Sequence, residues 1–380
     1  MVSRAPLALS LMIAVVWLML GSNAAADFSH SGSIKNLSAR SRSLVDDDPY
    51  FLNLTRLRLE PRYRYEDWVL DAAYDLELVA GSFLDSPDFA LLRDAPDPRY
   101  WDLQGDVHES REVLARHQLY RGTIQWRSPA GDFRFGRQQV NWSTALIWNP
   151  MDILDPVSPL QLEPDERIGI DALLWDKSWG ATGRISAVHA PQHSDENAST
   201  AVRAKRFFAG VDAAVMFGKF GEATKAGVSG SGSLVGTGWR TELVWSEPDT
   251  GDSYWQGVAD LNWAFRNGLN LAVEYFYNGR PVSPGILGLA SLVSTQPIYA
   301  GRHYTGLLAW QDITPFWQYR VVVIRNANDA SWVLYPRSTW VLPLNREIYF
   351  TAGAQWFGGD RESEYGKLEA LGLMEVQWFF

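Results

Sequence analysis

The feature that most constrains this 380-residue chain is a row of charged residues at alternate positions of one extended segment. Side chains of a β-strand point alternately to opposite faces, so such a segment is a strand with one charged face. The positions between the charges are apolar or aromatic, from Leu57 to Tyr65. The charged face carries Arg56, Arg58, Glu60, Arg62 and Arg64.

The same two-faced alternation recurs along most of the chain. No stretch of comparable length shows the 3.6-residue period of a helix. We therefore expect an all-β chain with strands of about ten residues, a pattern typical of a transmembrane antiparallel β-barrel. A soluble β-sandwich or propeller is the alternative, but no blade-length repeat supports it. Clear examples of the alternation are residues 68–78, 239–245, 255–265, 269–277 and 348–356.

Composition removes several classes of protein. The chain contains no cysteine, which excludes disulfides, thiolate metal sites and cysteine nucleophiles. Its formal net charge is −10 and it has no basic run, so we expect no nucleic-acid partner. Tryptophan is frequent instead, with 18 copies, and aromatic residues near strand ends suit the interfacial girdles of a membrane barrel.

Residues 1–26 have the pattern of a cleaved secretory signal. A basic Arg4 precedes the apolar residues 5–20, and small residues at 23–26 suit signal peptidase. An N-terminal membrane anchor is the alternative, but the apolar stretch is short for a membrane helix. We expect a mature chain of residues 27–380 that forms a single barrel domain.

The last residues form an amphipathic strand that ends on an aromatic side chain. Alternate positions from Ala370 to Phe380 are apolar, and Trp378 and Phe380 complete the segment. This ending resembles the C-terminal strand of Gram-negative outer-membrane barrels, whose terminal Phe is recognised by the barrel assembly machinery. The resemblance implies that the chain lies in the outer membrane and has that machinery as a partner.

The expected number of strands is about 16, with 14 and 18 as alternatives. Outer-membrane barrels usually have short turns at one end and longer loops at the other. Short links are expected at Glu66-Asp67, at Pro129-Ala130-Gly131 and at residues 218–221. The count of 16 requires that residues 222–246 form one strand, with the glycine-rich residues 227–238 as a bend or insertion. A barrel of this size encloses a water-filled channel.

The arginine row is expected to face that channel. Each Arg near the bilayer midplane costs about 2 to 4 kcal/mol on the lipid side, so four would cost on the order of 8 to 16 kcal/mol. Two interpretations stay open: a ladder of salt bridges in the wall, or a charged constriction that selects solutes. The expected pore-lining residues are Arg56, Arg58, Glu60, Arg62, Arg64, Asp71, Asp75, Glu77, Arg121, Arg127 and Arg134.

The densest local motif spans residues 135–156. A strand reading Gly136-Arg137-Gln138 leads to Trp142 and then to a loop with Asn149-Pro150 and Asp155-Pro156. The motif resembles uncharacterised proteobacterial porin-like barrels, although Ser143 departs from the glycine usual there. Two Asx-Pro turns stiffen a loop long enough to fold inward and narrow the channel, or to pack on the outer rim. The candidate constriction residues are Asn141, Trp142, Trp148, Asn149, Pro150, Asp152 and Asp155.

We therefore expect a porin-like channel for passive diffusion of small polar or charged solutes. The alternatives are a structural sheath or secretion partner with another protein in its lumen, and an outer-membrane enzyme acting on lipid. No catalytic motif, metal site or cofactor is predicted, since His189 and His193 flank Pro191 in an expected loop. Further expected partners are outer-membrane lipid and lipopolysaccharide, the latter near acidic residues 81–110, and a second copy of the chain.

Overall fold

The structure is a computed structural model. It describes residues 26–95, 99–163, 166–167, 169–192, 197–283, 297–343 and 347–380. The expected signal segment lies outside the described residues except for Ala26, so the cleavage site stays a prediction.

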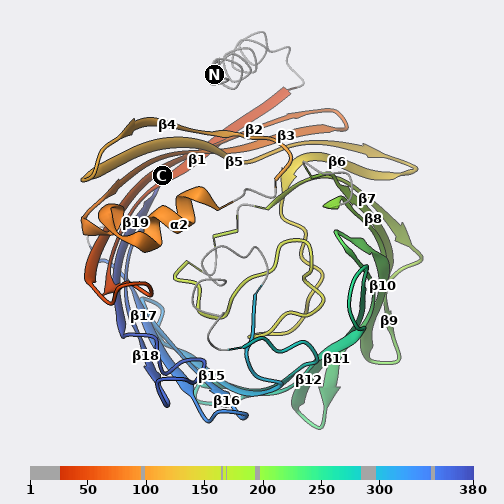
Figure 1. Cartoon of the computed structure of the whole chain (residues 1–380). Coiled ribbons are helices and arrows are strands. Elements are labelled where there is room, and N and C mark those ends of the chain that lie inside the picture. The colour runs from red at the N-terminus through yellow and green to blue at the C-terminus, as the bar shows by residue number, and fades with distance from the viewer. Residues whose placement is uncertain are drawn as a thin grey trace.

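Eighteen antiparallel strands form one closed barrel, which confirms the all-β barrel fold (Figure 1). Each strand pairs with its neighbour in sequence, and β1 (Ala26–Arg42) pairs with both β2 (Pro49–Tyr65) and β19 (Leu371–Phe379) to close the ring. A nineteenth strand, β4 (Gln104–Glu109), pairs only with β5 (Val113–Ser128). It lies beyond the end of β6 and continues that part of the wall.

The remaining strands are β3 (Trp68–Ala80), β6 (Gly131–Gln138), β7 (Ile170–Trp179), β8 (Gly183–Ala190), β9 (Ser199–Phe208), β10 (Val211–Phe220), β11 (Ala223–Leu234), β12 (Thr237–Pro248), β13 (Tyr254–Ala264), β14 (Asn270–Asn278), β15 (His303–Thr314), β16 (Trp317–Asn326), β17 (Trp332–Val341) and β18 (Ile348–Gly358). Two short helices, η1 (Ser82–Asp85) and α2 (Pro87–Asp94), lie between β3 and β4. No helix in the described ranges is long and apolar enough to cross a membrane.

The expected count of 16 strands was wrong, and the alternative of 18 holds. Two hairpins were missed, at Ala209-Gly210 and at Val235-Gly236, so residues 222–246 form two strands and not one. Both turns have positive φ at each residue: 50° and 84° in the first, 51° and 80° in the second. Such turns usually carry Asn or Asp first. Here Ala209 and Val235 occupy that place, so the sequence did not predict these two turns.

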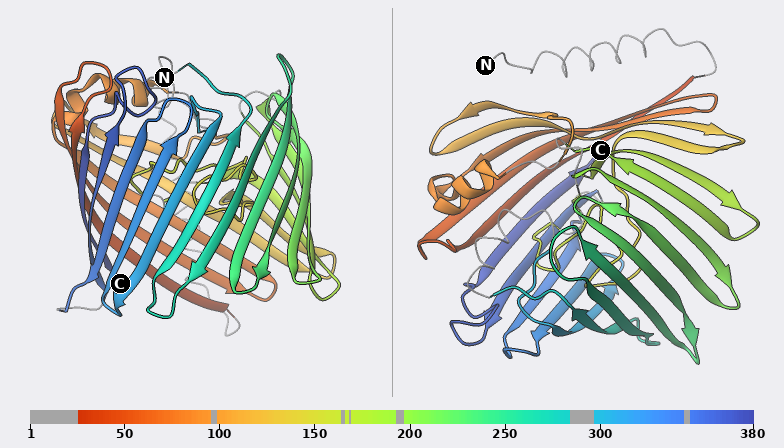
Figure 2. Two further views of the ribbon diagram at one scale, coloured as in Figure 1. Left: turned by 90° about the horizontal axis from the view of Figure 1, so that it is seen from below. Right: turned by 45° about the vertical axis from the view of Figure 1, so that its right-hand side comes forward.

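Short turns gather at one end of the barrel, called the turn end, and longer loops at the other, called the loop end (Figure 2). The first described residue and the C-terminus lie at the turn end, since Ala26 pairs with Tyr65 and Phe380 with Gly32. The strands tilt relative to the barrel axis. The link expected at residues 218–221 joins β10 to β11 at the loop end, contrary to its expected place.

The outer surface is apolar, with stacked aromatic side chains at the turn end. Trp68 lies 5.9 Å from Trp126 between ring centroids, and Trp126 lies 5.6 Å from Phe133. Trp317 stacks on Trp340 on the opposite wall. Amphipathic rings in this position suit a membrane interface.

The wall is uneven in height. Strands β1 and β2 each have 17 residues, whereas β6 and β8 each have 8. Five consecutive strands, β6 to β10, have at most 10 residues each, and β14 and β19 have 9.

Candidate functional site: the lumen and its internal loop

The loop between β6 and β7 is described at residues 139–163, 166–167 and 169, and these lie inside the barrel, where Figure 1 shows them crossing the lumen. Its apolar side chains are buried against the inner wall. Trp142 and Met151 belong to a cluster with Met216 and Val244. On the other side, Trp148 stacks on Phe276, with centroids 5.5 Å apart and planes 12° apart. The loop is therefore held by wall contacts on both sides.

Two wall glycines make room for this loop. A Cβ on Gly306 would lie 2.5 Å from a methyl of Ile147 and 2.9 Å from the Trp148 ring. A Cβ on Gly227 would lie 2.4 Å from the Met151 sulfur. Such distances are well inside van der Waals contact, so a side chain at either position would force the loop side chains to shift. Gly227 therefore serves β11 and not the bend expected at residues 227–238.

Glu242 on β12 fixes the first half of the loop. Its carboxylate accepts hydrogen bonds from the backbone N–H groups of Thr144 (2.5 Å), Ala145 (3.2 Å) and Met151 (3.0 Å). The hydroxyl of Ser143 donates to it at 2.8 Å, and that of Thr144 at 3.1 Å. Hydrogen bonds to a charged acceptor are the strong ones. One wall carboxylate thus orders residues 143–151.

Glu274 on β14 fixes the next turn in the same way. It accepts from the backbone N–H groups of Leu146 (3.0 Å), Ile147 (3.2 Å) and Trp148 (2.7 Å). Both Glu242 and Glu274 are at most 1% exposed. Because burying an unsatisfied carboxylate is costly, removal of the loop would leave both groups without these donors.

The second half of the loop is braced internally. The guanidinium of Arg167 donates to the Asp152 carboxylate at 2.5 Å and to the Asp155 carbonyl oxygen at 3.4 Å. Asp152 is 1% exposed, and burial raises its pKa to about 7 although Arg167 opposes the shift. Asn149 accepts from the Ser143 hydroxyl and begins the turn through Pro150 to Asp152. Asn141 accepts from the Ser143 N–H.

The loop ends against the arginine row. We call this cluster the wall–loop network: Lys35, Arg56 and Arg58 from the wall, and Glu163 and Glu166 from the loop, with the wall carboxylates Asp75 and Glu77. Lys35 Nζ lies 3.0 Å from Glu163 and 2.8 Å from Glu166.

Both arginines of this network pair with wall and loop carboxylates at once. Arg58 donates to Asp75 at 2.7 Å and to Glu166 at 2.8 Å. Arg56 donates to Glu77 at 2.7 Å and to Glu163 at 3.1 Å. Every one of these side chains therefore touches a group of opposite charge.

The wall–loop network contains three cations and four carboxylates, so the arginines are neutralised. Arg56 and Arg58 are each 9% exposed. Burial alone would raise the pKa of Glu166, but Lys35 and Arg58 outweigh it and lower the pKa to about 2. The salt-bridge ladder is present at Arg56 and Arg58, with partners on the wall and on the inward loop. The charged constriction stays a prediction.

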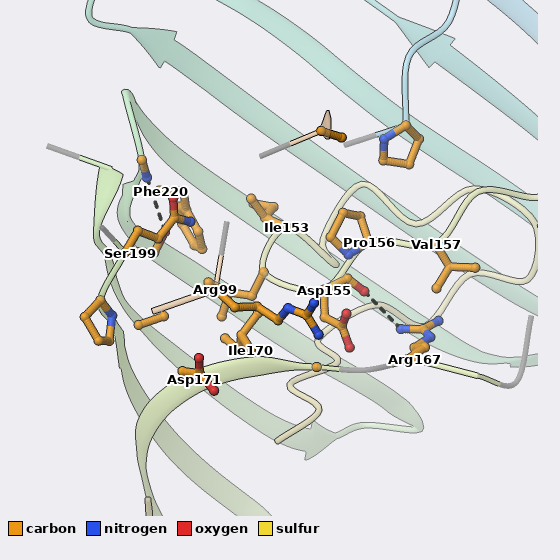
Figure 3. A pocket seen from close by; sticks show the side chains of 18 of the residues that line it. Arg99, Ile153, Asp155, Pro156, Val157, Arg167, Ile170, Asp171, Ser199 and Phe220 are labelled. Carbon is orange, nitrogen blue, oxygen red and sulfur yellow. Dashed lines mark hydrogen bonds between the residues drawn. The ribbon is translucent and has the colours of Figure 1, made fainter. Parts of the chain in front are cut away.

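Two cavities lie on either side of this network. The loop-end cavity has a volume of about 1180 Å³ and is bordered by residues 153–157 of the loop. Figure 3 shows Asp155, Arg167 and Arg99 facing its interior. The turn-end cavity measures about 550 Å³ and is lined by Arg58, Arg121 and Glu375 among others. Glu166 lines both cavities and so stands at the narrow region between them.

The other expected pore-lining residues lie along the same inner face but are less tightly held. Arg62 pairs with Asp71 at 3.1 Å, each side chain being 40% exposed. Arg121 donates to the Arg167 carbonyl oxygen at 2.7 Å. Glu60 accepts from the Ser31 hydroxyl. Three further arginines lie nearer the turn end: Arg64, Arg127 and Arg134. None of them forms an ion pair with a carboxylate in the described part of the chain.

Sequence reasoning missed six residues that build this site. Lys35 lies in the weakest predicted strand, and Glu242 and Glu274 were recognised only as polar positions of strands. Acidic residues in the loop opposite a basic wall are a usable signal, since Glu163 and Glu166 complement the arginine row. The missed residues are Lys35, Glu163, Glu166, Arg167, Glu242 and Glu274.

The histidines do not form a catalytic arrangement in the described ranges. His117 bonds to Tyr74, His189 to Thr200 and His303 to Tyr275, each through Nδ1 at 2.7 to 2.8 Å. None of these contacts includes an acid and a serine. The described residues also contain no group of three side chains able to hold a metal ion.

Solved structures with this fold cover almost the whole chain. OccK5 (OpdH) of Pseudomonas aeruginosa matches with a TM-score of 0.61 at 9% identity, over 93% of this chain and 98% of that one. OpdK with vanillate, from the same organism, matches with a TM-score of 0.60 at 9% identity over the same shares. OpdL matches with a TM-score of 0.58 at 12% identity, over 93% and 99%.

At these identities the likeness concerns the fold, and it agrees with the barrel that the motif of residues 135–156 implied. No protein-family model and no curated protein sequence matches the chain.

Proposed function

We propose that this chain is an outer-membrane porin-like channel for the passive diffusion of small polar or charged solutes. The observation that carries the proposal is the pair of cavities inside one closed barrel, separated by the inward loop and meeting at Glu166. An 18-stranded barrel has room for an aqueous channel, and an internal loop restricts it to small solutes.

The structural neighbours support the same function. They are outer-membrane porins of Pseudomonas, and one of them was crystallised with vanillate, a small carboxylate. We propose the Gram-negative outer membrane as the location, reached after cleavage of a signal before Asp27. Trp378 and Phe380 would present the C-terminal strand to the barrel assembly machinery, and acidic residues 81–110 would face lipopolysaccharide at the loop end.

The wall–loop network is the proposed selectivity region. Its seven charged groups nearly cancel, so small changes in charge there alter which ions enter. Arg62, Arg64, Arg121, Arg127 and Arg134 would extend a basic surface from it toward the turn end, with Asp71 and Glu60 between them.

The contents of the lumen and the contacts of the histidines fit the two alternative functions less well. A sheath or secretion partner needs an interior free for another protein, whereas the described residues of the loop between β6 and β7 fill part of this one. A lipid-acting enzyme needs a serine, a histidine and an acid at one rim, and the contacts of His117, His189 and His303 lack that combination.

Conductance in planar bilayers tests the proposal. The mature chain should give steady single channels, and Glu166→Gln should shift the reversal potential in a salt gradient toward anions, because a carboxylate is removed from the narrow region. Glu112→Gln, on the exposed outer loop, is the matched control and should leave selectivity unchanged. A folded barrel that never conducts would rule out the channel. Equal ion selectivity of the wild type and Glu166→Gln would show that Glu166 does not lie in the narrow region.

A further inference from the structure

The outer face of the barrel carries a cation at the loop end of β16. Side chains of a strand alternate between the two faces, and Arg325 is exposed whereas its neighbours Ile324 and Asn326 are buried. Among the described residues, the guanidinium of Arg325 has no ion pair and no hydrogen bond. By contrast, the outer-face Arg206 at the turn end lies over the Trp179 ring, 5.2 Å from its centroid. Arg325 is therefore an uncompensated charge on the lipid side of the wall.

Arg325 lies at the loop-end boundary of the apolar band. The outer face of β16 is apolar or aromatic from Val323 to Trp317, which stacks on Trp340 at the turn end. Trp317 and Arg325 are eight positions apart, or about 27 Å along the strand. At a tilt of about 35 to 45° this is about 19 to 22 Å across the bilayer, close to the roughly 25 Å apolar band of such barrels. The charge thus stands at the level of the lipid headgroups.

Polar groups surround Arg325 on the same face. In strand register it lies beside Thr305 of β15, which in turn lies beside Tyr275 of β14, and both are exposed. The next outer position of β15 toward the loop end is His303, whose Nδ1 lies 2.7 Å from the Tyr275 hydroxyl oxygen. Two hydroxyl groups and an imidazole, all able to donate hydrogen bonds, therefore occupy neighbouring positions.

On the turn-end side of Arg325 the surface is apolar. Val323 pairs with Leu307 of β15 and with Leu334 of β17, and Leu307 pairs with Val273 of β14. These four side chains form a continuous hydrocarbon surface across four strands, directly below the polar groups. A ligand that fits both parts has an anionic head and apolar chains.

A phosphate on an acylated headgroup has this chemistry. A guanidinium binds two phosphate oxygens at once through parallel N–H donors, and the hydroxyls of Thr305 and Tyr275 can donate to the remaining oxygen. Acyl chains attached to the same headgroup would lie on the apolar surface around Val323. Lipid A, the membrane anchor of lipopolysaccharide, combines these parts: a phosphorylated sugar headgroup with several acyl chains.

We propose that Arg325, with Thr305, Tyr275 and His303, forms a phosphate site for lipid A on the outer face of β14 to β17. The site rests on the proposed outer-membrane location and is independent of conduction through the lumen. It differs from the role expected for acidic residues 81–110, which need divalent cations to hold a phosphate, whereas Arg325 binds it directly. A bound lipid A would hold this side of the barrel in the outer leaflet.

Native mass spectrometry of the mature chain in detergent micelles tests the site. Diphosphoryl lipid A should stay bound to the wild type, and Arg325→Gln should lower the bound fraction at least fivefold. Arg325→Lys should stay within threefold of the wild type, since the charge is kept. The matched control Arg206→Gln removes an outer-face guanidinium at the turn end and should stay within twofold. Heat-dependent gel mobility checks that each barrel is folded.

Other lipids and free phosphate distinguish the ligand. Lipid A without its phosphates should bind the wild type at least fivefold more weakly, and equimolar inorganic phosphate, which has no acyl chains, should not displace diphosphoryl lipid A. Equal binding of lipid A by the wild type and Arg325→Gln would overturn the site. Displacement by inorganic phosphate, or binding of phosphatidylglycerol as strong as that of lipid A, would overturn the assignment to lipid A. None of these measurements needs conduction, so a negative result here leaves the proposed channel intact.

Discussion

Glu364 is a buried carboxyl group whose charge state affects the stability of the fold. It lies in the loop between β18 and β19 and is 4% exposed. Tyr304 and Asn326 donate to it at 2.5 and 2.7 Å, and its own N–H donates to Asp329 at 2.8 Å. Burial raises its pKa from 4.5 to about 7, with Asp329 adding to the shift and the hydrogen bonds opposing it.

This raised pKa predicts a barrel that is more stable in mild acid. Between pH 4.5 and pH 7 the folded state binds more protons at Glu364 than the unfolded state does, so stability falls as pH rises through this range. The loss is at most about 3 kcal/mol. Glu364→Gln should therefore weaken the pH dependence of the thermal unfolding midpoint, measured in detergent from pH 5 to pH 8. The dependence that remains would come from other buried acids such as Asp152.

Glu362→Gln, an exposed position in the same loop, is the control and should keep the full dependence on pH. An identical pH dependence in the wild type and in Glu364→Gln would show that Glu364 titrates in its ordinary range.

At the scale of elements, the internal loop depends on wall carboxylates more than on its own sequence. Glu242 accepts three backbone N–H groups and two hydroxyls, whereas Asp260, equally buried on the neighbouring strand, contacts Arg240 and Asn262 and no loop residue. The two acids thus differ in role although both lie on the inner wall.

We expect Glu242→Gln to loosen the loop while Asp260→Asn leaves it unchanged. Each hydrogen bond to a charged group contributes about 1.5 to 3 kcal/mol, and the amide of Gln would turn a donor toward the N–H groups of the loop. Amide hydrogen exchange at residues 143–151 should become at least tenfold faster in Glu242→Gln. Unchanged exchange would show that Trp142 and Trp148 hold the loop by packing alone.

The alternation of side chains predicted the strands well because it reflects local backbone geometry. The inward face of the arginine row was predictable too, since lipid exposure of Arg58 and its neighbours is prohibitive. The turns at Ala209 and Val235 could not be predicted, because alanine and valine are not typical turn residues. The partners Glu163 and Glu166 were missed for another reason. Their meeting with Lys35 depends on where a distant loop packs, and no local pattern records that.

At the scale of the whole molecule, barrel closure depends on the contact between the first and last strands. Gly32 and Phe380 exchange two backbone hydrogen bonds of 2.9 Å. A Cβ on Gly32 would lie 2.6 Å from both the Phe380 ring and the Arg58 carbonyl oxygen. The seam therefore closes only with a residue that has no side chain at this point.

Gly32→Ala should accordingly impair closure of the barrel. We expect a lower yield of the heat-modifiable folded form and a reduced urea midpoint in micelles, because the Phe380 ring and the seam must shift. Gly372→Ala is the matched control, since a Cβ at Gly372 meets nothing within 4 Å. If Gly32→Ala and Gly372→Ala refold with equal yield, the seam tolerates displacement and closure does not depend on Gly32.

The uneven wall has a consequence for the surrounding lipid. Eight residues of β6 or β8 span about 27 Å along the strand, and a tilt near 45° leaves about 19 Å across the bilayer, less than the roughly 25 Å apolar band of such barrels. The 17 residues of β1 exceed that band. Beside strands this short we expect the lipid to thin or a second protein to replace it. We therefore expect any subunit contact on the side of β6 to β10, the longest run of strands with at most 10 residues, which would give the barrel a preferred direction within the plane of the membrane.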